Sequence, residues 1–209
     1  MTVMSNNFFP GELVPNTVIA GCIAIYENVW PEPNQTIAMI ENEITKQDNG
    51  IYFQRAETTG RGPYQEYRTN KMMGVTHLAG IQNNALMQNI HNQFYMLLLA
   101  STIPYAKMYG INENLYHEHY QMLKYSEGEQ YKAHYDSGTG MGRAISCVCY
   151  LNNDYEGGEL EFPNFKIKIK PEPGMLLLFP SNFAYMHQAH PVTNGTKYTM
   201  VTWLKDREM

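Results

Sequence analysis

The chain is poor in cysteine and in positive charge. Its 209 residues include three cysteines, Cys22, Cys147 and Cys149, an odd number that argues against a disulfide framework. Cys147 and Cys149 would share one face of a strand, but no second pair completes a metal site, so we interpret both as core residues. The chain contains 15 Lys and Arg and 20 Asp and Glu, so its net charge is -5, and it has no run of basic residues. A nucleic-acid partner normally requires a basic patch, so we expect none.

Long hydrophobic runs are also missing. Residues 1–15 are polar and lack the basic-then-apolar pattern of a secretory signal. The first apolar stretch, residues 17–26, is too short to cross a bilayer. We therefore expect a soluble, cytoplasmic protein with no membrane partner.

The patterns present divide the chain into two parts within one domain, residues 1–209. Residues 1–115 should be mostly helical support. Here we expect a helix after Pro33 from Ile37, Ile40 and Ile44, and a long helix from Ile81 to Leu98 that ends at Pro104. Short strands are expected at residues 18–26 and 51–55.

Residues 116–205 change to short β-type runs separated by Gly, Asn, Asp and Pro turns, typical of a sandwich or barrel. Residues 165–170 alternate strictly, so Phe165, Ile167 and Ile169 should face inward and the lysines water. Further strands are expected at 175–179 and 198–204. The fold class is α+β, and the catalytic chemistry should lie in residues 116–205.

A metal-ligand pattern stands at the start of this second part. His134 and Asp136 are two apart, so on a strand they point to the same face. Two histidines and one carboxylate form the facial triad of non-haem Fe(II) oxygenases, which leaves open positions on the metal. By pattern alone, His187 and His190 are both candidates for the third ligand. His117 and His119 form a rival pair with no further ligand nearby, and His77 and His91 are interpreted as structural.

Several segments in this order resemble the prolyl 4-hydroxylase family of Fe(II)/2-oxoglutarate dioxygenases. The resemblance covers about residues 116–205, with a weaker match at Arg68-Thr69-Asn70. Its segments are 118–125, 128–136, Arg143, 150–163, 173–181, His187, 191–193 and 195–203. It implies a double-stranded β-helix, or jelly roll, with His134, Asp136 and His187 as iron ligands. The family separates its last ligand from a basic residue by ten positions, which fits His187 and Lys197 and not His190.

The resemblance also implies a binding site for 2-oxoglutarate. Lys197 should pair with the distal carboxylate of this dianion, and a lysine inside a barrel does need an anion to offset its burial. Tyr125 and Tyr150 stand where the family places tyrosines that touch 2-oxoglutarate, although barrel tyrosines often only pack. Trp203 matches an aromatic residue near the site.

The implied activity is hydroxylation of prolyl residues in a peptide or protein, using Fe(II), 2-oxoglutarate and O2, with ascorbate as a candidate additional cofactor. Hydroxylation of a free amino acid or other small molecule is the alternative. The negative net charge disfavours a nucleic-acid demethylase. The complete set of iron ligands disfavours an inactive binding module. Asp136 disfavours a halogenase, which would lack the carboxylate ligand so that halide could bind. The loop 57–68 is expected to close over the substrate. Neither the substrate itself nor the oligomeric state follows from these patterns.

Overall fold

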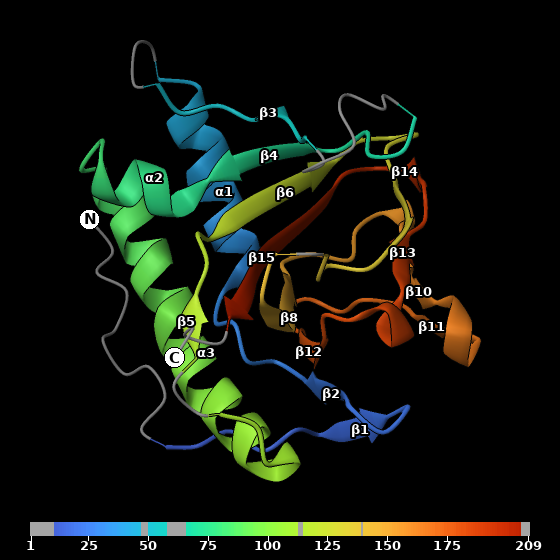
Figure 1. The fold of residues 1–209 in the computed structure, drawn as a ribbon. Coiled ribbons are helices and arrows are strands. Elements are labelled where there is room, and N and C mark those ends of the chain that lie inside the picture. The colour runs from blue at the N-terminus through green and yellow to red at the C-terminus, as the bar shows by residue number, and fades with distance from the viewer. Residues whose placement is uncertain (1–10, 47–49, 58–65, 113–114, 139, 206–209) are drawn as a thin grey trace.

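A computed structural model describes residues 11–46, 50–57, 66–112, 115–138 and 140–205. In these residues a large antiparallel sheet faces a smaller one, and the helices pack on the outer side of the large sheet (Figure 1). The predicted jelly roll with N-terminal supporting helices is therefore confirmed. None of the helices among the described residues is long and apolar enough to cross a membrane.

The large sheet has nine strands and combines both parts of the chain. Its order is β1-β2-β12-β8-β15-β6-β4-β3, with β5 paired to the end of β15. The strands are β1 (Thr17–Ile19), β2 (Ile23–Tyr26), β3 (Gln54–Arg55), β4 (Lys71–Gly74), β5 (Tyr116–His117), β6 (Gln121–Tyr125), β8 (Arg143–Tyr150), β12 (Leu176–Pro180) and β15 (Lys197–Lys205). The first 115 residues thus supply four strands in addition to the helices.

The smaller sheet closes the barrel opposite β8 and β12. Its order is β11-β10-β13-β7, and a separate two-stranded ribbon pairs β14 with β9. The strands are β7 (Tyr131–His134), β9 (Glu156–Gly157), β10 (Leu160–Phe162), β11 (Ile167–Ile169), β13 (His187–Ala189) and β14 (Val192–Asn194). Between the sheets lies an apolar layer that includes Leu160, Phe162, Leu177 and Phe179. This layer is the apolar core between the two sheets.

Three helices cover the outer face of the large sheet: α1 (Pro33–Ile44), α2 (Val75–Gly80) and α3 (Ala85–Tyr109). The expected helix after Pro33 is confirmed as α1, with Pro at its first turn, where the missing N–H costs nothing. Asn84 caps α3 by accepting a hydrogen bond from the backbone N–H of Met87. Apolar side chains of the helices and of the sheet join in one buried cluster.

The prediction that Pro104 ends the long helix is wrong, because α3 continues to Tyr109. A proline inside a helix leaves the carbonyl four residues earlier without its usual donor. That carbonyl belongs to Ala100, and it accepts the backbone N–H of Leu13 at 2.7 Å. A donor from a distant part of the chain therefore replaces the missing helical hydrogen bond.

Two other expected elements are shorter than the patterns suggested. Residues 18–26 form a hairpin, β1 and β2, because Ala20 and Gly21 take positive φ angles and turn the chain back. Of residues 51–55 only Gln54–Arg55 pair as a strand.

Ile81 ends α2 rather than lying on the buried face of α3, and it is 76% exposed. The inward alternation of Ile167 and Ile169 is confirmed in β11.

Candidate metal centre and the adjoining buried lysine

Three side chains converge at the mouth of the barrel. His134 ends β7 and His187 begins β13, and the two residues are direct partners in the antiparallel pairing of these strands. Asp136 follows β7, and its backbone N–H donates to the carbonyl of Ser181 at 3.0 Å. One donor atom from each of the three side chains lies within 4.8 Å of the others. They are the only group of three or more potential His, Cys, Asp or Glu ligands among the described residues.

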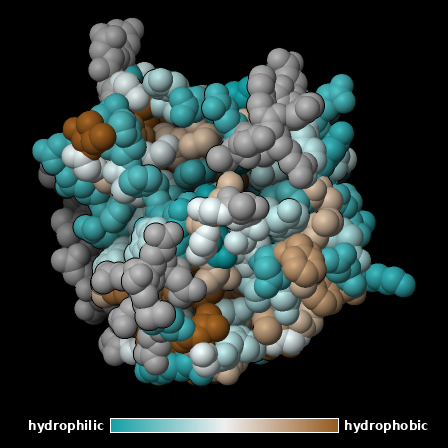
Figure 2. All heavy atoms as spheres, viewed as in Figure 1, coloured by the Kyte–Doolittle hydropathy of each residue, from teal (hydrophilic) through white to brown (hydrophobic). Residues whose placement is uncertain are grey.

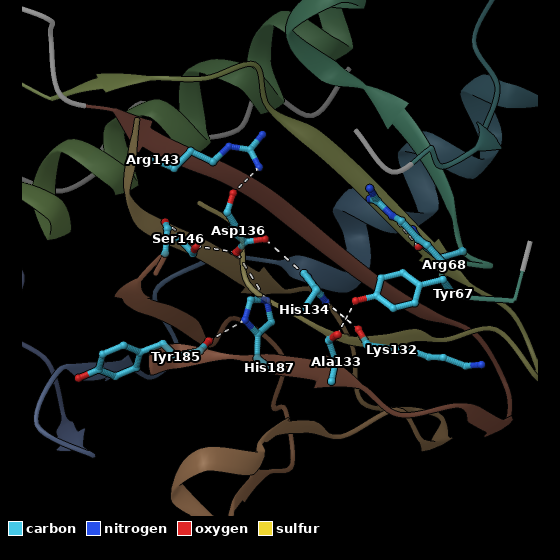
Figure 3. A network of polar contacts seen from close by, with 12 residues as sticks. Tyr67, Arg68, Lys132, Ala133, His134, Asp136, Arg143, Ser146, Tyr185 and His187 are labelled. Atoms are coloured by element: carbon cyan, nitrogen blue, oxygen red, sulfur yellow. Dashed lines mark hydrogen bonds and ion pairs between the residues drawn. The ribbon is translucent and has the colours of Figure 1, made fainter. Parts of the chain in front are cut away.

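Hydrogen bonds orient both imidazoles (Figure 3). The Nδ1 of His134 lies 2.8 Å from the carbonyl of Lys132, and the Nδ1 of His187 lies 3.1 Å from the carbonyl of Tyr185. A carbonyl only accepts, so Nδ1 carries the proton and Nε2 keeps its lone pair. The two Nε2 atoms lie 3.6 and 3.5 Å from the carboxylate oxygens of Asp136. Both lone pairs thus face the same point as the carboxylate.

The charge states at this point suit metal binding. Burial, helped by the neighbouring His187, lowers the pKa of His134 to about 3, so its imidazole is neutral at pH 7. Burial alone would raise the pKa of Asp136, but the two histidines and hydrogen bonds from Ser146 and Trp203 hold it below its usual value. The neutral imidazole of His134, the imidazole of His187 and the carboxylate of Asp136 together supply the two-histidine, one-carboxylate donor set that Fe(II) takes in a facial triad.

A buried pair of serines fixes the carboxylate. The hydroxyl of Ser146 on β8 donates to Oδ2 of Asp136 at 2.6 Å and lies 2.8 Å from the hydroxyl of Ser181. Ser181 also accepts the backbone N–H groups of Asp136 and Ser137 through its carbonyl. Both serines are 1% exposed. The sequence offered one clue to this role, a polar residue at 146 inside an apolar β-type run.

Aromatic and basic side chains line the outer edge of the site. The ring of Tyr131 stacks on that of His134 with 3.5 Å between centroids, and the guanidinium of Arg68 lies 4.7 Å from the centroid of Tyr131. Arg143 packs on the Trp203 ring and is held by both carboxylate oxygens of Glu118. We had not assigned a role to Tyr131 or Arg143 from the sequence.

Lys197 lines the same hollow as His134, Asp136 and His187. It begins β15, is 2% exposed, and its ammonium donates to the carbonyl of Gly158 at 2.6 Å. Burial lowers its pKa from 10.5 to about 7, although the charge of Glu159 acts in the opposite direction, and no carboxylate among the described residues forms an ion pair with it. The rings of Tyr125 and Tyr150 lie 5.3 and 5.1 Å from the ammonium. An anion placed here would restore the charge of Lys197.

Tyr150 supports the same interpretation. Its hydroxyl is buried and has no hydrogen-bond partner among the described residues. Burial raises its pKa, so the phenol remains a donor at neutral pH. The unpaired hydroxyl of Tyr150 and the buried ammonium of Lys197 are both hydrogen-bond donors in this hollow. A carboxylate, which accepts hydrogen bonds and carries a negative charge, fits these two donors. Tyr125, Tyr150, Lys197 and the three converging residues all line this hollow.

The remaining histidines considered from the sequence lie elsewhere. His190 contacts Glu161 at 2.5 Å on the smaller sheet and is not part of the converging group. The Nδ1 of His117 lies 2.7 Å from the hydroxyl of Tyr120, in a packed aromatic cluster. In the loop 57–68, residues 58–65 lie outside the described part, so its expected closure stays a prediction. Arg68 donates to the carbonyl of Glu57 at 2.9 Å, which brings the loop's two ends together at the mouth.

Sequence comparisons identify known proteins that are similar to this chain. The model of the 2OG-Fe(II) oxygenase superfamily matches residues 120–205. A putative prolyl 4-hydroxylase of Acanthamoeba polyphaga mimivirus is 30% identical over 111 residues, covering 44% of this chain and 46% of the relative. The prolyl hydroxylase EGLN3 of Mus musculus is 35% identical over 89 residues, covering 39% and 37%. The chain therefore spans less than half of the length of these curated relatives.

Solved structures share the fold. A prolyl hydroxylase from Trichoplax adhaerens, in complex with a peptide fragment of a hypoxia inducible factor, matches with a TM-score of 0.69 and 19% identity, over 90% of this chain and 84% of the other. A prolyl-4-hydroxylase from Pseudomonas putida matches with a TM-score of 0.64 and 18% identity, over 90% and 94%. The match to the model of the 2OG-Fe(II) oxygenase superfamily covers residues 120–205, which contain the converging His134, Asp136 and His187 together with Lys197.

Proposed function

We propose that the chain is an Fe(II)- and 2-oxoglutarate-dependent dioxygenase that hydroxylates prolyl residues in a peptide or protein. The observation that carries this proposal is the convergence of His134, Asp136 and His187 beside a buried lysine that forms no ion pair with a carboxylate in the described part of the chain. A barrel that only bound a ligand would need neither feature. The prolyl substrate is suggested by the similarity to proteins named prolyl hydroxylases.

In this proposal His134, Asp136 and His187 hold the iron on one face, so that other positions stay open toward the hollow. Lys197 binds the distal carboxylate of 2-oxoglutarate, and the hydroxyl of Tyr150 donates to the same ligand. When bound, iron, 2-oxoglutarate and O2 supply the oxidation: one oxygen atom enters the substrate C–H bond, the other enters succinate, and CO2 leaves. Ascorbate remains a candidate additional cofactor.

The protein itself supplies geometry and a dry environment. Ser146 and Trp203 hold the carboxylate of Asp136, and backbone carbonyls hold the imidazoles, so little reorganisation is required when metal binds. Residues 116–205 act as the catalytic core. In the described residues before 113, strands β1 to β4 complete the large sheet and the helices pack against its outer face, which supports the proposal of one domain.

The test is an assay of succinate formation from 2-oxoglutarate by the purified chain with Fe(II), across a panel that includes proline-rich peptides. We expect succinate to form with Fe(II) and 2-oxoglutarate both present, and a hydroxylated peptide, heavier by one oxygen atom, to form in parallel. The Asp136→Ala variant is the control and should make neither. Succinate formation that survives Asp136→Ala, or no succinate in any condition, would contradict the proposal.

A further inference from the structure

A second hollow lies beside the metal centre, at the edge of the large sheet where β3, β4 and α2 meet. Its volume is about 630 Å³, larger than the 420 Å³ of the mouth that contains His134 and Asp136. Nothing in the reaction proposed above uses it. The residues that matter for its chemistry are Tyr52, Gln54, Met72, Ile81, Gln82 and Gln121.

The second hollow is continuous with the mouth of the barrel. Met72 of β4 and Gln121 of β6 line both. These strands are neighbours in the sheet, with Met72 paired to Leu123 and Gly74 paired to Gln121. One groove therefore runs from the metal ligands across β6 and β4 toward the end of α2. A ligand that reacts at the metal can extend along it without leaving the surface.

The lining of the second hollow contains two histidines, His77 and His119, but no Lys, Arg, Asp or Glu side chain, whereas the mouth contains Glu57, Arg68 and Arg143. This contrast in charge separates the classes of occupant. A nucleic-acid strand would require lysines or arginines along its path, which this lining lacks. An uncharged occupant meets no ammonium, guanidinium or carboxylate group here that it would have to desolvate.

The groups that are present suit a polypeptide. The side-chain amides of Gln54, Gln82 and Gln121 form no hydrogen bond with another described residue, and an amide can both donate to and accept from a peptide group. Beside them Ile81 is 76% exposed and Tyr52 is 61% exposed. Figure 2 shows hydrophobic surface standing out over the end of α2, where Ile81 lies. Exposed apolar groups beside unpaired amides provide both kinds of contact that an extended chain needs.

We propose that this second hollow binds the uncharged segment of a polypeptide substrate that flanks the hydroxylated residue on one side. The inference rests on the proposed function and narrows its polypeptide substrate to one with an uncharged flank on one side of the hydroxylated residue. A single small molecule reacting at the metal would fill only the mouth and would gain nothing from the second hollow.

The first experiment uses 15-residue peptides with one central proline and flanks of Ala, Gly, Gln and Ser. The KM and kcat for hydroxylation are measured for the whole peptide and for versions shortened by five residues at either end. Removal of one particular flank should raise KM roughly tenfold with kcat little changed, and removal of the other should change KM less than about threefold. Placing two glutamates in the sensitive flank should have the same effect as removing it.

The second experiment places a charge in the groove. Ile81→Glu should remove the difference in KM between the whole peptide and the peptide lacking the sensitive flank. Val14→Glu is a matched control, because Val14 is also an aliphatic residue and is 77% exposed, yet it does not line either hollow. The control should keep the full difference in KM.

The possible failures are distinguishable. Equal KM values for the whole and both shortened peptides would overturn the role of the second hollow and leave the proposed function intact. Succinate formation without hydroxylation of any peptide would overturn the polypeptide substrate class, and the second hollow's role with it. An absence of 2-oxoglutarate turnover under every condition would instead refute the proposed function.

Discussion

Replacement of Lys197 by methionine should weaken 2-oxoglutarate binding by one to two orders of magnitude. Methionine fills a similar volume, so the change removes the charge and little packing. Lys197 is 2% exposed, and within the described part of the chain its ammonium donates only to the carbonyl of Gly158. A hydrogen bond between an ammonium and a carboxylate contributes about 1.5–3 kcal/mol, which corresponds to a rise in Kd of about 10- to 150-fold.

The affinity should also depend on pH in a defined direction. Without ligand the pKa of Lys197 is lowered to about 7, so the ammonium is complete below that pH and is lost above it. A dianionic ligand binds the protonated form, so binding takes up a proton whenever the pH exceeds 7. The Kd for 2-oxoglutarate should therefore be nearly constant below pH 7 and rise by up to about tenfold per pH unit above it. Lys197→Met should abolish this dependence.

Calorimetric titration of 2-oxoglutarate into the Mn(II)-loaded protein, between pH 6 and 9, measures both effects. Lys124→Met is a matched control. Lys124 lies on β6, next to the residue that pairs with Lys197, but its ammonium forms an ion pair with Glu41 on the outer face of the sheet. The control should keep the affinity and the pH dependence of the unmodified chain. An affinity of Lys197→Met within about threefold of the unmodified chain, or a Kd independent of pH in that chain, would refute the reasoning.

Three further predictions concern the metal centre and the core. His187→Ala should abolish Mn(II) binding in a metal titration, whereas His190→Ala should bind Mn(II) almost normally, since His190 contacts Glu161; the reverse pattern would move the ligand role to His190. Ser146→Ala removes a hydrogen bond to a buried carboxylate, so Mn(II) affinity should fall about 10- to 100-fold, and Ser146→Thr should restore part of it. Leu177→Ala empties a site that is 0% exposed, and urea denaturation should show a loss of about 2–5 kcal/mol in the free energy of unfolding; a loss below 1 kcal/mol would contradict the packing described.

Short-range patterns in the sequence determined much of the fold. The alternation around Ile167 and Ile169 identified an inward face, and the spacing of Ile37, Ile40 and Ile44 identified α1. These predictions held because the side-chain periods of strands and helices are local properties of the backbone. The resemblance to a known family went further, since the order of its segments already indicated the jelly roll and grouped His187 with the earlier pair.

Predictions failed where a distant segment supplied the deciding contact. Pro104 should end a helix by local rules, but Leu13 donates to the carbonyl that the proline leaves free. Ile81 fits the period of α3, but the chain turns before the helix begins at Ala85, which leaves Ile81 exposed. Local periodicity contains no information about such contacts, because it records only the spacing of residues along one element.

The candidate site divides in the same way. The spacing of His134 and Asp136 predicts two donors on one side of a segment as long as that segment is extended. Only the tertiary structure brings His187 opposite His134, sets Ser146 against the carboxylate, and buries Lys197 without a carboxylate partner among the described residues. The first of these relations joins strands whose paired residues are 53 positions apart (187 - 134 = 53), and the others depend on packing in the barrel and on removal from water. Pairing and desolvation are properties of the assembled barrel, because they arise only when both sheets are in contact.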